Sequence, residues 1–239
     1  MQIDIEKYPQ KLLVDVSHIY TSAGFLRVQY QEGTPDKMRT FLLCPDTYHP
    51  ETMAVEAVEA NGFPRGFAVM PTAEINIIYL ASILNTAVSW IVMTGGKLNK
   101  RASITAKRLA KVLIRVLPSN EQKAVAYLHY LQMNIRKQKR ESSFNPYLNY
   151  WESVYSELQN AVALELALPK VFKEYEIEVL ASWCALIGKC SAEHPDMDLI
   201  ALQEVLGKEL LAPQNNVTGN LNKLRVVMRE VNQQVEETV

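Results

Sequence analysis

Alternation of apolar and polar residues in the first 118 positions predicts short strands. Two stretches alternate with a period of two, as half-buried strands do, at residues 12–17 and 25–30. Three apolar runs are each stopped by a proline, which has no amide hydrogen to continue a strand, at residues 39–44, 66–70 and 112–117. Gly33-Thr34-Pro35-Asp36 predicts a turn.

Two helices are predicted within the same region. Thr72 can cap a helix over about 75–93, and Gly95-Gly96 marks its end. Ser103 or Thr105 can start a second, shorter helix within residues 97–111. Strands mixed with short helices predict a small mixed α/β domain over residues 1–118.

At residue 119 the period changes to that of a long helix. Ser119 and Gln122 fit a capping box, in which each side chain bonds the backbone amide of the other residue. Four apolar residues then recur at steps of four, three and four: Ala124, Leu128, Leu131 and Ile135. Because such a seam suits packing against one other helix, residues 119–141 predict a long spacer or dimerisation helix.

Beyond this helix the strand pattern disappears. A linker is predicted at 142–149, followed by helices at residues 148–168, 171–188, 197–211 and 217–236, with Gly188 or a proline ending the first three. The last helix contains a second seam of Val217, Leu221, Leu224, Met228, Val231 and Val235. The two seams can pair with each other, pair across a dimer or serve as ordinary core faces. The chain therefore predicts an α+β protein whose C-terminal domain, 142–239, is all-helical.

The composition is that of a globular chain. Its 239 residues are 48% hydrophobic and 21% charged, which excludes collagen-like, low-complexity and wholly disordered classes. Cys44, Cys184 and Cys190 have no metal-binding spacing and fit buried thiols in a reducing compartment. The first residues lack the pattern of a signal peptide, and polar residues interrupt 75–93, which predicts a buried helix rather than a membrane span. We therefore expect a cytoplasmic protein without a membrane partner.

The formal net charge of −1 hides an uneven distribution along the chain. Residues 75–140 hold twelve basic residues and one acid, Glu121, whereas residues 1–74 carry −4 and residues 141–239 carry −8. The +11 segment ends in Arg136, Lys137, Lys139 and Arg140, which are equally well explained as a solvated helix end. A local excess of this size favours phosphates or an acidic protein as partners.

Catalytic patterns are missing from the sequence. It has no nucleophile elbow, no phosphate-binding glycine loop and no zinc-protease helix. The four histidines, His18, His49, His129 and His194, have no carboxylate or cysteine neighbours at ligand spacing. We therefore expect no enzymatic activity, no cofactor and no metal site.

The basic segment offers a DNA-binding surface instead. Gly95-Gly96 predicts a hinge, and a basic loop and the short helix follow it. The residues that can contact phosphates or base edges are Lys97, Lys100, Arg101, Ser103, Lys107, Arg108 and Lys111. An acidic protein partner and a plain solvated surface stay open as alternatives.

Several motifs here occur in an order that resembles one family. They are Gly66-Phe67-Ala68-Val69-Met70-Pro71, Tyr79-Leu80-Ala81-Ser82-Ile83-Leu84-Asn85, Gly95-Gly96, Ser103-Ile104 with Leu109, and Leu117-Pro118-Ser119-Asn120-Glu121-Gln122. Residues 11–22 look like the opening strand of the same module. The order resembles the specificity subunit of type I DNA restriction-modification systems, and the resemblance covers about residues 10–141.

The resemblance implies a function as well as a fold. In that family a target-recognition domain reads duplex DNA, while paired helices space two such domains and dock methyltransferase subunits. It implies double-stranded DNA and a DNA methyltransferase as partners, and a partner helix at 119–141. The recognition region here, about 108 residues, is shorter than is usual in the family, and residues 150–239 are helical where a second recognition domain is expected. The chain is therefore either a half-subunit that forms a homodimer or an interaction module that keeps the fold without reading DNA.

A weaker resemblance lies in the C-terminal region. The helices predicted within 198–230, with a turn through Pro213, look like a helix-turn-helix regulator whose second helix occupies the recognition position. The region is acidic overall, so helical packing or oligomerisation is the preferred interpretation.

Overall fold

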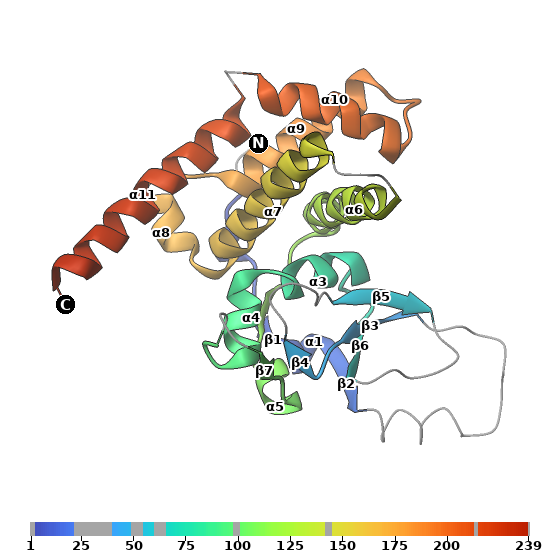
Figure 1. Ribbon diagram of the computed structural model, residues 1–239, viewed down its shortest axis with the longest axis vertical. Helices are drawn as coiled ribbons and strands as arrows, with labels where there is room; N and C mark the ends of the chain where they lie inside the picture. Colours follow the sequence, from blue (N-terminus) through green and yellow to red (C-terminus); the bar gives the residue numbers. More distant parts are fainter. Residues whose placement is uncertain are drawn as a thin grey trace. The chain divides into compact units, whose positions relative to one another are not determined.

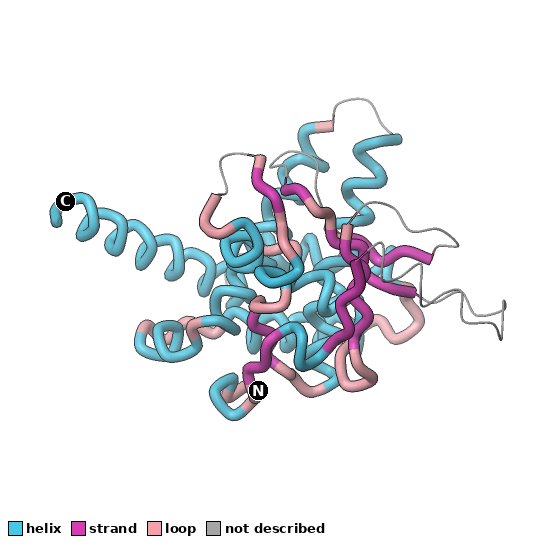
Figure 2. Tube along the Cα trace, turned by 90° about the horizontal axis from the view of Figure 1, so that it is seen from below, coloured by secondary structure: helices cyan, strands magenta, loops and turns pink. Residues whose placement is uncertain are grey.

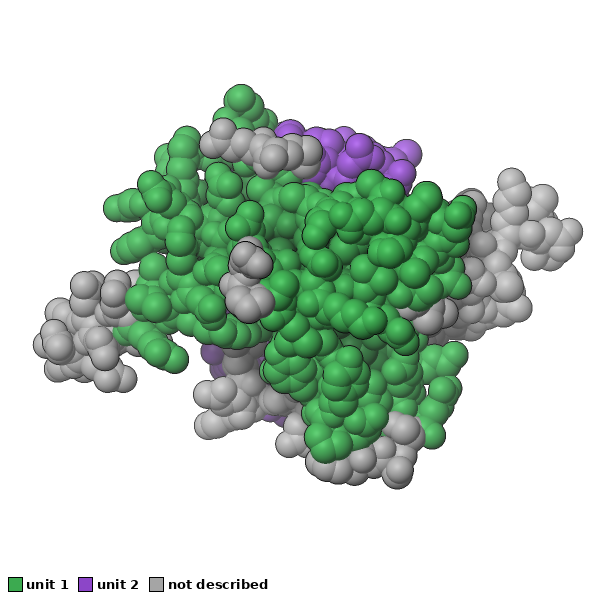
Figure 3. Space-filling view, turned by 90° about the horizontal axis from the view of Figure 1, so that it is seen from above, with its two compact units in different colours: residues 1–7, 131–239 green, residues 8–130 purple. Residues whose placement is uncertain are grey.

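A computed structural model describes residues 3–21, 40–48, 55–59, 66–97, 101–141, 145–212 and 215–238. Within them the fold is α+β, as predicted: small antiparallel sheets occur in the first half of the chain, and helices alone make up the second half (Figure 1). Contacts divide the chain into two units, coloured separately in Figure 3. Unit 2 comprises residues 8–130, and unit 1 comprises residues 1–7 and 131–239.

Unit 2 contains the described strands. Four of them form an antiparallel sheet in the order β2 (Ser17–Thr21), β6 (Phe67–Pro71), β3 (Thr40–Cys44) and β5 (Glu56–Glu59). Two short ribbons pair β1 (Gln10–Leu12) with β8 (Leu113–Arg115) and β4 (Thr47–Tyr48) with β7 (Ala102–Ser103). The strands predicted at 39–44, 66–70 and 112–117 are confirmed, whereas the predicted strand at 25–30 and turn at 33–36 lie outside the described residues.

The strand predicted at 12–17 is wrong, because one helical turn, α1 (Leu13–Val16), separates β1 from β2. Leu13 and Val16 are buried while Val14 is exposed, which is the spacing of a helical face. The Asp15 carboxylate accepts a hydrogen bond from the Leu12 amide, and the Ser17 hydroxyl donates to the Leu13 carbonyl. Such local bonds compete with an extended backbone and favour a turn.

The single helix predicted at 75–93 is two helices, α3 (Ile77–Leu84) and α4 (Ala87–Thr94), with a bend of 71° between them. Asn85 lies at the bend, and its side-chain amide exchanges two hydrogen bonds of 2.8 Å with the backbone of Val55. Among the described residues no single helix is long and apolar enough to cross a bilayer, although this bent pair passes the same test by length and composition.

Polar side chains cap these helices. Asn76, rather than the predicted Thr72, caps α3 by accepting from two backbone amides in its first turn. Thr86 caps α4, and Gly95 ends it in the left-handed conformation with φ of 67°, as predicted. The short helix predicted within 97–111 is α5 (Ala106–Leu109), capped by Thr105.

The long helix predicted at 119–141 is α6 (Ser119–Glu141). The predicted capping box is wrong, because the buried Gln122 side chain bonds backbone groups outside the helix. Its oxygen accepts from the Asn76 amide at 2.7 Å, and its nitrogen donates to the carbonyls of Glu74 and Leu117. Gln122 therefore ties the first turn of α6 to the loop that precedes α3.

Unit 1 contains α7 (Pro146–Ala167), α8 (Pro169–Glu174), α9 (Val179–Glu193), α10 (Leu199–Leu211) and α11 (Asn216–Thr238). Pro146 lies in the predicted linker but starts α7, because proline suits the first position of a helix. The helix predicted at 171–188 is broken between α8 and α9, where Glu176 has a φ of 52°. Gly188 lies inside α9 rather than at its end.

Candidate nucleic-acid interface

The candidate DNA-binding residues gather where α4 ends and β7 and α5 follow, in a surface that we call the basic corner, residues 94–97 and 101–111. β7 pairs with β4, and the Ile104 amide donates to the Asp46 carbonyl at 2.8 Å, which anchors the corner to unit 2. The described candidates all have exposed side chains: Lys97, Arg101, Ser103, Lys107, Arg108 and Lys111. Lys100 lies outside the described residues.

Arg108 differs from its neighbours because its guanidinium reaches the backbone. Its Nη1 lies 3.5 Å from both the Thr94 carbonyl and the Ser103 carbonyl. A Cβ built at Gly95 would lie 3.1 Å from the Arg108 Cζ, so the guanidinium packs against this glycine. The Thr94 carbonyl belongs to the negative end of α4, where a cation is favourable. Arg108 therefore joins the two ends of the segment 95–103, in addition to carrying a positive charge.

Two features that lower the positive charge around the corner could not be read from the sequence. Asp46, from the loop between β3 and β4, is exposed next to β7, so one acid accompanies the basic residues. Arg115, which adds to the +11 of the segment, is buried, and its Nη1 donates to the Tyr8 carbonyl at 2.8 Å. The positive charge of the exposed surface is therefore smaller than the charge of the segment.

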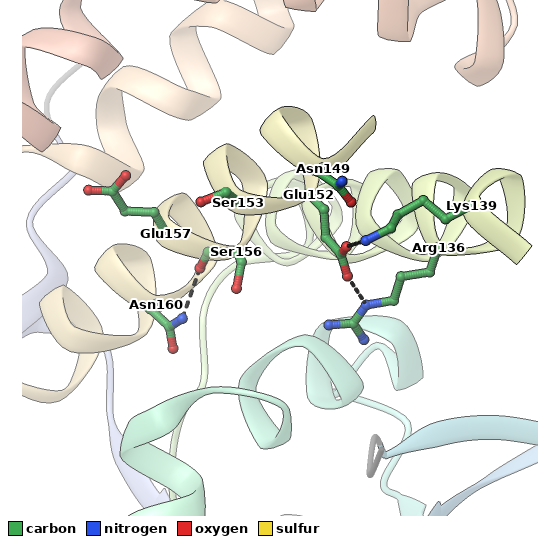
Figure 4. A pocket seen from close by; sticks show the side chains of 8 residues that line it. All are labelled: Arg136, Lys139, Asn149, Glu152, Ser153, Ser156, Glu157 and Asn160. Atoms are coloured by element: carbon green, nitrogen blue, oxygen red, sulfur yellow. Dashed lines mark hydrogen bonds and ion pairs between the residues drawn. The ribbon is translucent and has the colours of Figure 1, made fainter. Parts of the chain in front are cut away.

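The basic end of α6 lies in unit 1 and is engaged by a carboxylate. Glu152 of α7 accepts from Arg136 Nε at 3.0 Å and from Lys139 Nζ (Figure 4). Burial opposes the ionisation of Glu152, but the hydrogen bonds and charges of these two cations hold its pKa below its ordinary value. Arg136 and Lys139 are therefore partly neutralised.

A polar groove of about 440 Å³ surrounds this ion pair. Its walls come from α6 and α7, and it is lined by Arg136, Lys139, Asn149, Glu152, Ser153, Ser156, Glu157 and Asn160 (Figure 4). The lining holds two cations and two carboxylates, so the groove has no excess positive charge for a phosphate.

The apolar seam of α6 is covered in the single chain. Ala124 is 8% exposed, and Leu128, Leu131 and Ile135 are fully buried. A helix that pairs with a second copy would leave such a seam partly open in one copy. These four residues are core positions of this chain, and a role for them in dimerisation or partner binding stays a prediction.

The second helix of the predicted helix-turn-helix is α11, which follows α10 after residues 212–215. Two basic side chains of α11 contact other parts of unit 1. Lys223 Nζ donates to the Glu176 carbonyl at 3.3 Å, and the Arg225 guanidinium binds the Glu157 carboxylate of α7. Because these cations face other parts of unit 1, they are less available to DNA phosphates than the exposed lysines of the basic corner.

Within the part of the chain that the structure describes, no group of three or more His, Cys, Asp or Glu side chains is arranged to hold a metal ion. Cys44 is buried, and burial raises the pKa of its thiol to about 12, which keeps it protonated and unreactive. When the chain is compared with family models, curated proteins and solved structures, nothing matches.

Proposed function

We propose that this chain is a duplex-DNA-binding protein of the type I specificity-subunit kind, which contacts DNA through the basic corner and recruits a DNA methyltransferase. The observation that carries the proposal is the exposure of the five described basic candidates, Lys97, Arg101, Lys107, Arg108 and Lys111, on one corner of unit 2. Lysine and arginine side chains on one surface neutralise phosphates and release counterions, which drives DNA binding at low salt.

The positions of these residues suggest separate roles. Lys107 lies in α5 and Lys111 in the turn that follows it, and both side chains are exposed, so each is able to contact a phosphate. Ser103, exposed in β7, is able to hydrogen-bond a phosphate or a base edge. Arg108, whose Nη1 lies 3.5 Å from the carbonyls of Thr94 and Ser103, adds a positive charge next to Ser103.

The test measures binding of the full chain to a labelled duplex by fluorescence anisotropy, from about 50 mM salt upward. Lys107→Glu combined with Lys111→Glu is expected to weaken binding at least about tenfold and to reduce the salt slope by about 2. Lys170→Glu combined with Lys208→Glu is the matched control, because it changes the net charge equally at exposed sites of unit 1. No binding to duplex, or an equal loss in both variants, would overturn the proposal.

A second candidate function, an interaction module that docks a methyltransferase without reading DNA, is favoured by an apolar patch on unit 2. Leu12 and Leu113 are cross-strand partners in the β1–β8 ribbon and are 38% and 51% exposed. Val14, at 51%, follows in the adjacent turn. Exposed apolar groups on one surface are typical of protein contacts. Leu113→Glu should then abolish co-sedimentation with the methyltransferase subunit, and the unsubstituted chain should show no preference for one duplex sequence over another.

A further inference from the structure

The first half of α11 is packed into unit 1. Val217 and Leu221, the first two residues of its apolar seam, are 1% and 5% exposed. The Asn220 amide donates to the Ser182 hydroxyl of α9 at 2.9 Å, and Arg225 binds Glu157 of α7. These contacts hold α11 as far as residue 225.

The second half of the same helix extends past these contacts. In both Figure 1 and Figure 2 it runs away from the other helices of unit 1 to the C-terminus. Met228, which follows Leu224 on the seam, is 44% exposed. In the sequence the same spacing continues through Val231 and Val235. The start of this seam is buried in unit 1, but its continuation at Met228 is exposed. An exposed apolar seam on a helix is a surface that can pair with another helix.

The charges along this half of the helix indicate which helix would cover it. Lys223 and Arg225 are engaged by Glu176 and Glu157, so Arg229 is the first base of this half that is not held by those contacts, and Glu230 follows it directly in the sequence. Two copies in parallel would place Arg229 beside Arg229 and Glu230 beside Glu230, whereas two antiparallel copies place each Arg229 beside the Glu230 of the other. The apolar seam also fits antiparallel pairing. When the two helices cross between Arg229 and Glu230, Leu224 of one copy lies opposite Val235 of the other, and Met228 lies opposite Val231.

We propose that residues 224–238 of α11 pair with the same residues of a second copy of this chain, in an antiparallel two-helix contact centred between Arg229 and Glu230. The contact spans about two heptads, which is short for a helical pair, so the dimer dissociates in the micromolar range. The pairing does not depend on DNA binding, because the basic corner belongs to unit 2.

Sedimentation equilibrium of the full chain from about 1 to about 100 µM tests the pairing. We expect a mass that rises toward twice that of one chain, and a dissociation constant at least about tenfold higher for Met228→Glu. Met197→Glu is the matched control: Met197 is 43% exposed in the same unit, and its substitution is expected to change the constant less than about twofold. A single chain at every concentration, or an equal effect of the control, would overturn the proposal.

Cysteine cross-linking tests the direction. When Met228→Cys and Val231→Cys chains are mixed and oxidised, antiparallel pairing gives the mixed disulfide between positions 228 and 231 in excess over either symmetric product. Wild-type chain under the same oxidant controls for the native Cys184, whose side chain is partly exposed. A predominance of the symmetric product through position 228 would show parallel pairing and contradict the proposal.

Discussion

In unit 2 neutral side chains make buried hydrogen bonds to the backbone, whereas in unit 1 carboxylates make ion pairs between helices. Gln122 bonds three backbone groups, Asn85 bonds the backbone of Val55, and the Tyr79 hydroxyl donates to the Arg115 carbonyl at 2.6 Å. Among these groups the amides do not titrate, and burial raises the pKa of the Tyr79 hydroxyl above its ordinary value. These contacts of unit 2 are therefore insensitive to pH near neutrality.

In unit 1 four carboxylates from two helices hold the bundle together. Glu152, Glu157 and Glu165 project from α7, and Glu209 of α10 binds Lys189 of α9. Three of them pair with cations of neighbouring helices, and Glu165 accepts from the Leu180 amide at 2.7 Å, in the first turn of α9. The three ion pairs depend on ionised carboxylates, whereas Glu165, whose pKa burial raises to about 8, makes its contact as a neutral acid at pH 7.

The two units also differ in how much positive charge of the +11 segment, residues 75–140, they leave without a carboxylate partner. Its first part lies in unit 2, where Lys107 and Lys111 are exposed on the basic corner. Its last part lies in unit 1, where Glu152 binds Arg136 and Lys139. A charge run along the chain is therefore a surface charge only where the fold brings no carboxylate to it.

The largest expected effect is a pH dependence confined to unit 1. Burial, with a smaller contribution from Glu178, raises the pKa of Glu165 to about 8, against about 4.3 in an unfolded chain. Between these values the folded state holds a proton that the unfolded state has lost, so stability falls as pH rises, by up to about 5 kcal/mol. Glu165→Gln should flatten this dependence because its amide cannot ionise.

Tryptophan fluorescence during urea unfolding at pH 5 to 8 separates the units. Trp151 and Trp183 lie in unit 1 and Trp90 lies in unit 2, so Trp90→Phe leaves a signal from unit 1 alone. An equal pH slope in a variant that keeps only Trp90, or a flat slope for unit 1, would show that the two units do not differ in this way.

The next effect tests the neutral contacts of unit 2. Gln122→Ala leaves one amide and two carbonyls without their side-chain partner at a site that is 3% exposed. We expect a loss of about 2–3 kcal/mol in the free energy of unfolding, independent of pH. Lys123→Ala, at the exposed neighbouring position of the same helix, should change it by less than about 0.5 kcal/mol. Trp90 fluorescence reports both variants.

The smallest effect distinguishes two helical glycines of unit 1. A Cβ at Gly188 of α9 would meet nothing within 4 Å, so Gly188→Ala should stabilise by about 0.5–1 kcal/mol through helix propensity. A Cβ at Gly207 of α10 would lie 3.1 Å from the Trp151 ring, so Gly207→Ala should destabilise. Thermal unfolding of the two variants, with midpoints moving in opposite directions, checks this expectation.

Patterns within short stretches predicted much of the fold. A proline after an apolar run located β3 and β6, the change of period at residue 119 located α6, and Gly95 located the end of α4. Two of the errors, at Asn85 and at Gln122, occurred where a polar side chain bonds a distant backbone group, whereas at residues 12–17 the bonds are local. Asn85 breaks a helix by bonding Val55, a residue thirty positions earlier, and nothing in its neighbourhood along the chain predicts that bond.

The candidate site divides in the same way. The excess of basic residues over acids from 97 to 111, and the short helix that carries two of these bases, follow from the sequence because both properties are local. The burial of Arg115, the position of Asp46 beside β7 and the binding of Glu152 to the end of α6 depend on tertiary contacts. The field at a surface is the sum over charges that are close in space, and residues distant in the chain become neighbours only when it folds.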